Sequence, residues 1–510
     1  MSRIFSNPFK PHVRHVSSLR RWTTNGLPLL CLAFVTACAT VGPDYQTPAT
    51  KIAATWQAAV PHQGSTHSLL EWWRSYNAPI LTDLLRAAEG DHSTLLQAAA
   101  AIASARANRD QAAANTMPSL SAGATATRSG SLGSGNGANS AVTSGTGNSA
   151  ATQTGAISTV SSASLDASWE IDLFGAGRRN NEAANARVEA RQADWHDARV
   201  SLAAEVASEY VSYRACALLS ENSRNNLESL RKTANSTAVA VAQGLVAPAN
   251  AILINASVAN AAASLNVQEA ECEIGIKALV ALTGLDEPAL RAKLGSTAQK
   301  IPNPEVLKVT TLPVQLLSQR PDLVSAERSL AAASAEIGVA EANRYPRLSL
   351  LGSISVSNTQ ATGTLIKTTP WSFGPSLTLP LFDGGSRRAD VARARATYES
   401  ALASYQGAVR KAIRETEQSL VRLYAATRRS EDVANSARDY WRYYESAQQH
   451  WRGGGISLLD LEEARRNALQ AQQSAINLQR DRVLYGIALY KALGGGWQAN
   501  QTTNSTGVSQ

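Results

Sequence analysis

The stretch from Leu381 to Tyr405, "LFDGGSRRADVARARATYESALASY", repeats a pattern that the chain already contains from Leu173 to Trp195, "LFGAGRRNNEAANARVEARQADW". Each stretch opens with Leu-Phe, passes through a glycine-rich turn and two arginines, and enters an alanine-rich helical pattern. Phe174 and Phe382 are 208 residues apart. The chain therefore contains one structural module twice, and this module decides the fold.

Upstream of each glycine turn, apolar and polar residues alternate with a period of two. The alternation predicts strands at about 119–128 and 157–174 in the first copy, and at about 347–357 and 371–382 in the second. Successive side chains of a strand point to opposite faces, so each segment has one apolar face and one face of mostly Ser and Thr. Segments of about ten residues can cross a bilayer when tilted, which favours a membrane barrel over a soluble β-sandwich.

Downstream of each glycine turn, the pattern becomes helical. Residues 176–242 contain no proline, and apolar residues recur there in steps of three, four and seven, as they do after Val391. At about 1.5 Å per residue, such a helix is about 100 Å long. Each long helix runs into a glycine-bearing turn, "QGLVAPAN" at 243–250 or "RGGGISLLD" at 452–460, and a returning helix follows. The module is thus helix, strand hairpin, long helix, turn, helix.

Four strands per chain are too few for a closed barrel, because known barrels begin at about eight strands. Open sheet edges are not tolerated in lipid, so the chain must oligomerise. Aromatic residues make up only 6% of the sequence, which suits long helices that pack through small residues better than a thick globular core. We expect a barrel in a membrane that continues into a long helical assembly with a wet interior.

The N-terminus has the features of a secretory signal. Basic residues precede the apolar run "GLPLLCLAFVTA", which is too short to span a bilayer. Val35-Thr36-Ala37-Cys38 resembles the lipobox of bacterial lipoproteins, so we expect cleavage after residue 37, a covalent lipid on Cys38 and no other cofactor. The alternative is an ordinary signal peptide. Removal of residues 1–37 lowers the net charge from +8 to +3, which argues against a nucleic-acid partner.

The sequence as a whole resembles the TolC-like outer membrane factors, in their lipoprotein (NodT-type) branch. The resemblance rests on "CATVGPDYQTP" from Cys38, the turns "LFGAGRR" and "LFDGGSRR", and the closing "YKALGGGW" at 490–497. It implies an α+β membrane protein: a homotrimer with a 12-stranded outer-membrane β-barrel, four strands per chain, continued by a periplasmic α-helical barrel. It also implies docking to a periplasmic adaptor and an inner-membrane pump, and expulsion of small molecules from a Gram-negative bacterium.

The expected domains follow from the signal, the repeats and the resemblance. They are a signal peptide at 1–37, a lipid-anchored segment at 38–75, a first repeat at 76–290, a second repeat at 312–497 and a disordered tail at 498–510. Ala39 is not the aspartate that retains lipoproteins in the inner membrane, so we expect the outer membrane. A passive trimeric porin and a surface adhesin with a helical stalk remain alternatives.

The two long-helix turns are the expected adaptor-docking tips, although they could also be bare helix connections. Glycines in such turns allow left-handed backbone and close approach of a partner. The tip residues are Gln243, Gly244, Leu245 and Val246 in the first turn, and Arg452, Gly453, Gly454 and Gly455 in the second.

Asp460 and Glu463 are the candidate periplasmic gate. They lie three residues apart, on one face of the second returning helix, and alignment of the turns places Asn250 and Leu253 at the matching positions. The resemblance implies acidic rings at the periplasmic constriction, with Glu463 where an aspartate is more usual. The competing interpretation is that acids in the first turn of a helix serve its cap and dipole.

Chemistry of other kinds finds little support in the sequence, and we expect no enzyme. "GAGRRN" lacks the third glycine of a dinucleotide fingerprint, and no pair of histidines has metal-ligand spacing. Cys216 and Cys272 lie in helical patterns. An oxidising compartment would allow a disulfide, but we expect two buried free thiols.

Overall fold

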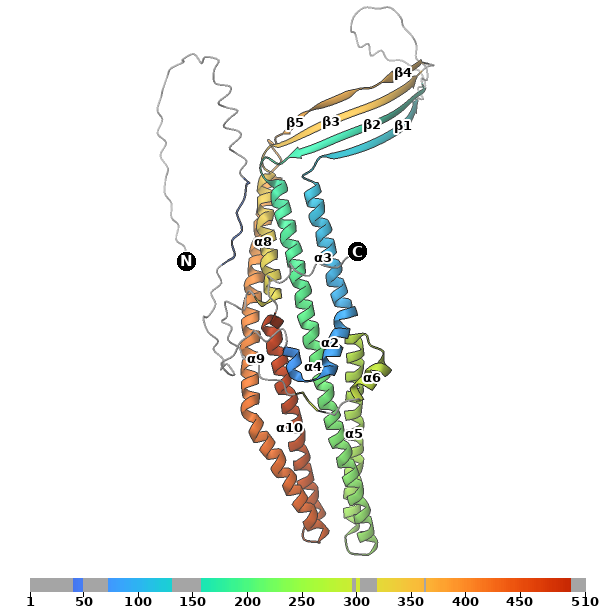
Figure 1. The fold of residues 1–510 in the computed structure, drawn as a ribbon, viewed down its shortest axis with the longest axis vertical. Coiled ribbons are helices and arrows are strands. Elements are labelled where there is room, and N and C mark those ends of the chain that lie inside the picture. The colour runs from blue at the N-terminus through green and yellow to red at the C-terminus, as the bar shows by residue number, and fades with distance from the viewer. Residues whose placement is uncertain are drawn as a thin grey trace, which may run out of the picture.

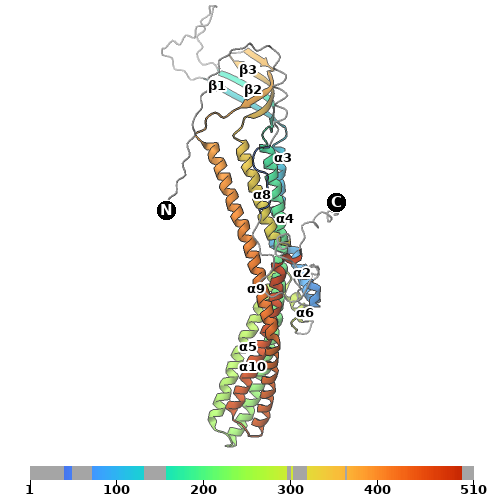
Figure 2. The ribbon, with the colours of Figure 1, turned by 90° about the vertical axis from the view of Figure 1, so that its left-hand side faces the viewer.

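The computed structural model describes residues 40–48, 72–130, 157–295, 300–302, 319–361 and 364–496. The molecule is long and narrow, with a sheet at one end and two helical hairpins at the other (Figures 1 and 2). The expected signal peptide, Cys38 and the expected tail at 498–510 lie outside the described residues.

The helices fall into two matching sets. The long helices α4 and α9 have 67 residues each, and the helices that lead to the sheet, α3 and α8, have 22 each. The first set is η2 (Trp72–Tyr76), α2 (Pro79–Asp91), α3 (Ser93–Ala114), α4 (Ala176–Ala242), α5 (Pro248–Thr283) and α6 (Glu287–Gly295). The second is α8 (Pro321–Ala342), α9 (Ser386–Arg452), α10 (Leu458–Ala492) and η3 (Gly494–Gly496). The two internal repeats are confirmed.

The strands form one antiparallel sheet. Its members are β1 (Ser119–Gly130), β2 (Ile157–Ile171), β3 (Arg347–Ala361), β4 (Thr364–Thr368) and β5 (Trp371–Thr378). β1, β2 and β3 pair in that order, and β4 and β5 both pair with β3. The returning strand therefore starts before the expected residue 371 and is interrupted around Pro370, because proline has no backbone N–H to donate. It ends at Thr378, short of the expected 382.

Directly opposed residues sort the sheet into an apolar and a polar face. One row joins Leu165, Ile354 and Trp371, which are 42%, 49% and 77% exposed in the protomer. The next row joins Asp166 and Ser353, where the Ser353 hydroxyl donates to Asp166 Oδ1 over 2.7 Å. The protomer thus presents one apolar sheet face outward, as the period of two predicts.

Two apolar cores lie at different levels of the described residues, and a third, small cluster of alanines packs α4 against α8. The larger lies at mid-height, where η2 and α2 pack with α4, α9 and α10 (Figure 1). Tyr490 of α10 stacks on Trp72 there, with ring centroids 5.0 Å apart. The smaller core, which includes Leu230, Ile254, Tyr444 and Leu461, joins the two hairpins below this level.

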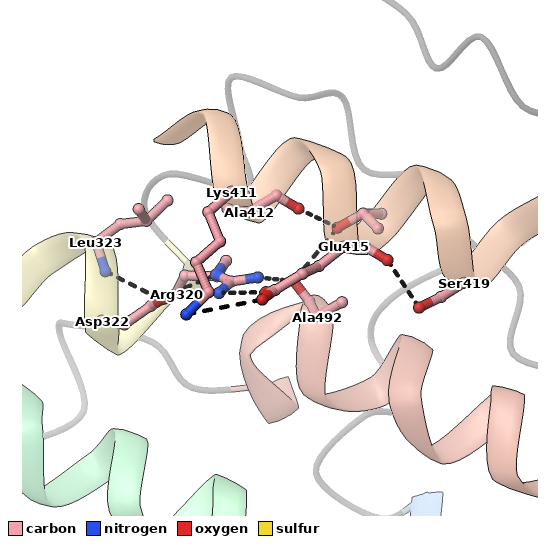
Figure 3. Close-up of polar contacts among 9 residues, drawn as sticks. Arg320, Asp322, Leu323, Lys411, Ala412, Glu415, Ser419 and Ala492 are labelled. Carbon is pink, nitrogen blue, oxygen red and sulfur yellow. Dashed lines mark hydrogen bonds and ion pairs between the residues drawn. The ribbon is translucent and has the colours of Figure 1, made fainter. Parts of the chain in front are cut away.

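Arg320 connects the end of α10 to the start of α8 (Figure 3). Its guanidinium donates to the Ala492 carbonyl over 2.9 Å and to both oxygens of Asp322 over 2.9 and 2.6 Å, and it pairs with Glu415 of α9 over 3.1 Å. It thereby satisfies a carbonyl at the C-terminal end of α10, a group that a helix leaves without an intrahelical partner. These contacts therefore connect the end of α10, in the lower half of the second repeat, to the start of α8, in its upper half.

Among the described residues, the sheet, the upper helices and the lower helices each have two unpaired borders. The sheet ends in β1 and in β4/β5, the upper helices run in the order α3, α4, α8, α9, and the lower helices in the order α5, α4, α10, α9. A head-to-tail interface joins one border to the other, and it forms a ring when the rotation closes.

The expectation of two free thiols is wrong. Cys216 of α4 and Cys272 of α5 form a disulfide, with Cα atoms 5.5 Å apart. The two helices run side by side in opposite directions from the turn at 243–247, which brings these distant residues to one level. Periodicity placed both cysteines on helices but did not show that they face each other.

Candidate functional site

Arg179, in the first turn of α4, fixes the segment that follows Cys38. Its side chain is only 5% exposed. The guanidinium pairs with Asp44 over 2.7 Å and with Glu182 over 2.8 Å, and it donates to the carbonyls of Val41 and Gly42 over 3.4 and 3.3 Å. Residues 41–44 are therefore held along the top of α4.

Close backbone contacts continue this attachment on both sides. The Val41 N–H donates to the Phe174 carbonyl over 3.1 Å, and a side chain on Gly42, whose φ is +101°, would collide with Gly338 of α8. Thr40 likewise lies against Gly175, in the turn between β2 and α4. Thr40, two residues after Cys38, therefore lies at the junction between the sheet and the helices.

The repeat does not duplicate this binding site. The helices α4 and α9 begin 210 residues apart, because two more residues separate Phe382 from α9 than separate Phe174 from α4. Ala389 therefore occupies the position that matches Arg179. The paired arginines stand out in the sequence, but this difference between the repeats becomes visible only when the starts of α4 and α9 are aligned.

The two tip turns share one backbone conformation. In the first, Gly244 has a φ of +70°, its N–H donates to Val241, and the Leu245 N–H donates to Ala240. In the second, Gly454 has a φ of +74°, its N–H donates to Trp451, and the Gly455 N–H donates to His450. This pattern is the Schellman motif, which requires left-handed backbone at one position and explains one glycine in each turn.

The tip residues form the far end of each hairpin (Figures 1 and 2). Leu245 is 78% exposed, which is unusual for a large apolar side chain. Gln243, Gly244 and Arg452 to Gly455 are exposed as well, whereas Val246 is half-buried.

Asp460 serves as a helix cap. Its Oδ2 accepts from the Ser457 hydroxyl over 2.6 Å and from the Ser457 N–H over 3.1 Å, while the Ser457 Oγ accepts from the Asp460 N–H over 3.2 Å. These hydrogen bonds, first that of the Ser457 hydroxyl, lower the pKa of Asp460. The capping role is thus present, and it leaves the carboxylate exposed at the start of α10.

Glu463 is exposed on the same helix, but the neighbouring Glu462 is not. Glu462 is 7% exposed and pairs with Arg465, itself 3% exposed, over 2.8 Å. Burial raises the pKa of Glu462, and the positive charge of Arg465 opposes that rise. This buried pair was not predicted from the sequence. The signal was the spacing of Leu458, Leu461, Arg465 and Ala468, which puts Arg465 on the apolar stripe of α10.

The described residues contain neither a metal-binding cluster nor a helix that could span a membrane. No three His, Cys, Asp or Glu side chains within them are grouped to hold a metal ion. None of the helices in this part of the chain is both long and apolar enough to cross a membrane.

Comparisons with known proteins agree along nearly the whole chain. The family described as "Outer membrane efflux protein" matches residues 84–285 and 312–495. Nodulation protein T of Rhizobium leguminosarum bv. trifolii is 30% identical over 485 residues, which cover 94% of this chain and 97% of that protein. The pyoverdine export outer membrane protein OpmQ of Pseudomonas aeruginosa is 28% identical, over 92% of this chain and 98% of that protein.

A solved structure has the same fold. The outer-membrane channel OprN superposes with a TM-score of 0.78 and 30% identity, over 90% of this chain and all of that one.

Proposed function

The chain belongs to the outer membrane efflux protein family, and from that premise we propose that three copies form the exit duct of a tripartite efflux system. The duct passes drugs or other small molecules from an inner-membrane pump and a periplasmic adaptor to the outside. The observation that carries the proposal is the pair of unpaired borders that the sheet, the upper helices and the lower helices each have within the described residues. Only a ring of copies covers them all, and a ring encloses a bore.

Deletion of the gene tests this function. The deletion strain should become more susceptible to several unrelated toxic compounds in a broad panel, and the wild-type gene should restore tolerance. A panel unchanged by the deletion would contradict an efflux role. Restoration by a variant that cannot enter the outer membrane would contradict the duct.

For the anchor, we propose acylation of Cys38. The binding of residues 41–44 by Arg179 supports it, because this attachment holds the chain at the junction of sheet and helices, close to the membrane surface. Cys38→Ser should abolish incorporation of labelled palmitate while the protein stays in the outer membrane through its barrel. Palmitate labelling that persists in this variant would exclude the assignment.

For the tips, we propose contact with the adaptor. Leu245 supports this, because it is 78% exposed at the end of the first hairpin, so the described residues leave most of this apolar side chain uncovered. Leu245→Asp should weaken crosslinking to the adaptor without reducing the amount of trimer. The matched control is Val239→Asp, six residues earlier on α4 and 64% exposed. If the wild type, Leu245→Asp and Val239→Asp all crosslink equally, the adaptor contacts another part of the protein.

For the gate, we propose that Asp460 and Glu463 form two acidic rings in the trimer, which favour cations in the bore. Because Asp460 also caps α10, its removal disturbs the helix, and Glu463→Gln is the cleaner test. In planar bilayers, Glu463→Gln and the Asp460→Ala, Glu463→Ala double variant should both reduce cation selectivity and block by multivalent cations. Unchanged selectivity in Glu463→Gln would leave the cap as the only role of the acids.

A further inference from the structure

A groove between α3 and α4, below the sheet, has a small apolar floor and a polar rim. The two helices run side by side there (Figure 1), and the cavity between them has a volume of about 610 Å³. Small buried side chains on both helices leave this room, among them Ala105, Ala112 and Ala184. The rim carries amides and two arginines: Asn108, Gln111 and Asn115 of α3, and Asn180, Arg187 and Arg191 of α4.

The two arginines of the rim have donors to spare. Arg187 pairs with Glu336 of α8, and Arg191 pairs with Asp194, one turn further along α4, over 2.8 Å. Both side chains stay accessible, at 49% and 56% exposure. A guanidinium has five N–H donors in a planar fork, and one carboxylate engages only one edge of that fork. Each arginine can therefore bind a further acceptor in the groove.

The groove lies on the opposite side of α4 from the N-terminal segment. Arg187 and Arg191 belong to one stripe of the helix, and Glu182 and Glu189 belong to another, about half a turn away. The second stripe lines a cavity together with Tyr45 of the N-terminal segment. A segment inside the bore would obstruct the duct, so the side with Tyr45 is the outer one. In the proposed duct, the groove therefore faces the bore.

The neighbouring copy in a ring leaves the groove open. On α3, the buried Ala105 and Ala112 face α4. Ala103 and Asp110 lie about half a turn from them and form the border toward the next copy. The amides of the rim lie between these two stripes, on the wall of the bore.

The second repeat does not duplicate the two arginines. Because α9 begins 210 residues after α4, Thr397 and Ala401 match Arg187 and Arg191. Because α8 begins 228 residues after α3, Glu336 stands where α3 has an amide. A trimer would therefore contain one such groove per chain.

The side chains of the rim define the chemistry that the groove can bind. The fork of a guanidinium matches a carboxylate, which it binds through two parallel hydrogen bonds. Side-chain amides both donate and accept, so they suit hydroxyl and amide groups of the same molecule. Glu336 and Asp194 balance the positive charge, which disfavours tight binding of any anion that lacks these further groups.

We propose that this groove is a transit site in the wall of the bore for small carboxylated solutes that also carry hydroxyl or amide groups. Arg187 and Arg191 bind the carboxylate, and the amides of α3 orient the rest of the molecule. The proposal rests on the proposed function as a duct and adds a class of solute that the duct would hold.

Binding of citrate to the purified trimer tests the site, because citrate carries carboxylates and a hydroxyl. Isothermal titration at neutral pH and low salt should find one site per chain. The double variant Arg187→Gln, Arg191→Gln should raise the Kd about tenfold or more, the factor expected for loss of a charge-assisted hydrogen bond. Arg328→Gln is the matched control, because it removes the ion pair between α8 and Glu189 on the outer side. It should leave the Kd unchanged.

Assembly of the variants is expected, because exposed ion pairs contribute little to stability. If the glutamine double variant forms no trimer, Arg191→Gln replaces it, since its ion pair lies within α4. This single variant should still weaken citrate binding. Arg187→Lys, Arg191→Lys keeps the charge but loses the fork, so it should also bind more weakly than wild type. Wild-type affinity in the lysine variant would show that charge alone is recognised, and the proposal would be wrong.

Protection of an introduced cysteine locates the bound citrate. Asn108→Cys places an exposed thiol on the rim, and Asn185→Cys places one on the outer side of α4. Citrate should slow the reaction of a maleimide with the first thiol and not with the second. Citrate that protects neither thiol, or that binds no better than sucrose, would overturn the proposal. A conducting trimer without citrate binding contradicts this site alone, whereas the absence of any conducting trimer contradicts the duct.

Discussion

At the scale of single residues, Arg179 shows how one side chain can set the place of a terminus. Arg179→Ala should release residues 41–44 and lower the free energy of unfolding by about 1–2 kcal/mol, because charge-assisted hydrogen bonds to the exposed carboxylates of Asp44 and Glu182 are lost. Limited proteolysis should then cut within residues 40–48. The exposed Arg388, in the first turn of α9, supplies the control Arg388→Ala. Equal protection in both variants would mean that other contacts hold the segment.

Asp460 gives a residue-scale prediction with a pH dependence. Its pKa is lowered in the folded protein by the Ser457 hydroxyl and N–H, so the carboxylate stabilises the start of α10 above its ordinary pKa near 3.8. That contribution is lost as the pH falls through the lowered value. Asp460→Ala should therefore speed amide hydrogen exchange at 457–463 at pH 7, and the difference from wild type should shrink as the pH falls through the lowered pKa of Asp460. A difference that does not depend on pH would assign the effect to the side chain's packing.

At the scale of elements, the strand β2 separates two environments at adjacent residues. Leu165 lies on the apolar row and Asp166 on the polar row. Leu165→Arg would place a charge in lipid and should cost about 2–4 kcal/mol per copy near the bilayer centre, which should prevent insertion. Asp166→Arg should still insert, because its face lines a wet bore. Membrane fractionation distinguishes them, and insertion of both would reverse the assignment of faces.

The hairpin of α4 and α5 provides the second element-scale prediction. The Cys216–Cys272 disulfide encloses 56 residues of chain, and loop-closure entropy allows it to contribute up to about 4 kcal/mol. The double variant Cys216→Ser, Cys272→Ser should speed hydrogen exchange in α5 and leave α10 unaffected. Peptide mapping without reductant should recover the two cysteines joined. Recovery of free thiols would instead support the expectation from the sequence that Cys216 and Cys272 are not bonded to each other.

At the scale of the whole molecule, the number of strands per chain fixes the number of copies once the number of strands in the barrel is known. Each chain contributes four strand positions, because β4 and β5 both pair with β3 as parts of one returning strand. Native mass spectrometry of the detergent-extracted protein should find three chains, each at most 54.0 kDa before lipid is added. A dimer or a tetramer would imply 8 or 16 strands and would contradict the likeness to OprN-type channels.

The sequence by itself determined what depends on local period and local backbone. Alternation with a period of two showed which strand residues form the apolar face of the sheet, and the repeat of "LFGAGRR" and "LFDGGSRR" showed that one module occurs twice. Glycines at the tips marked left-handed backbone at Gly244 and Gly454. These features depend on side-chain period and steric limits within a few residues, so no distant partner is needed to recognise them.

The tertiary structure alone decided what depends on partners far apart in the chain. Cys216 meets Cys272 over 56 residues, Arg179 meets Asp44 over 135, and Arg465 meets Thr233 over 232. In each case the sequence offered a residue that is ordinarily exposed or ordinarily free, and packing of two helices or of a helix and the N-terminal segment changed its environment. Burial and pairing are properties of the surfaces that meet, and a helical period shows only which residues share a face.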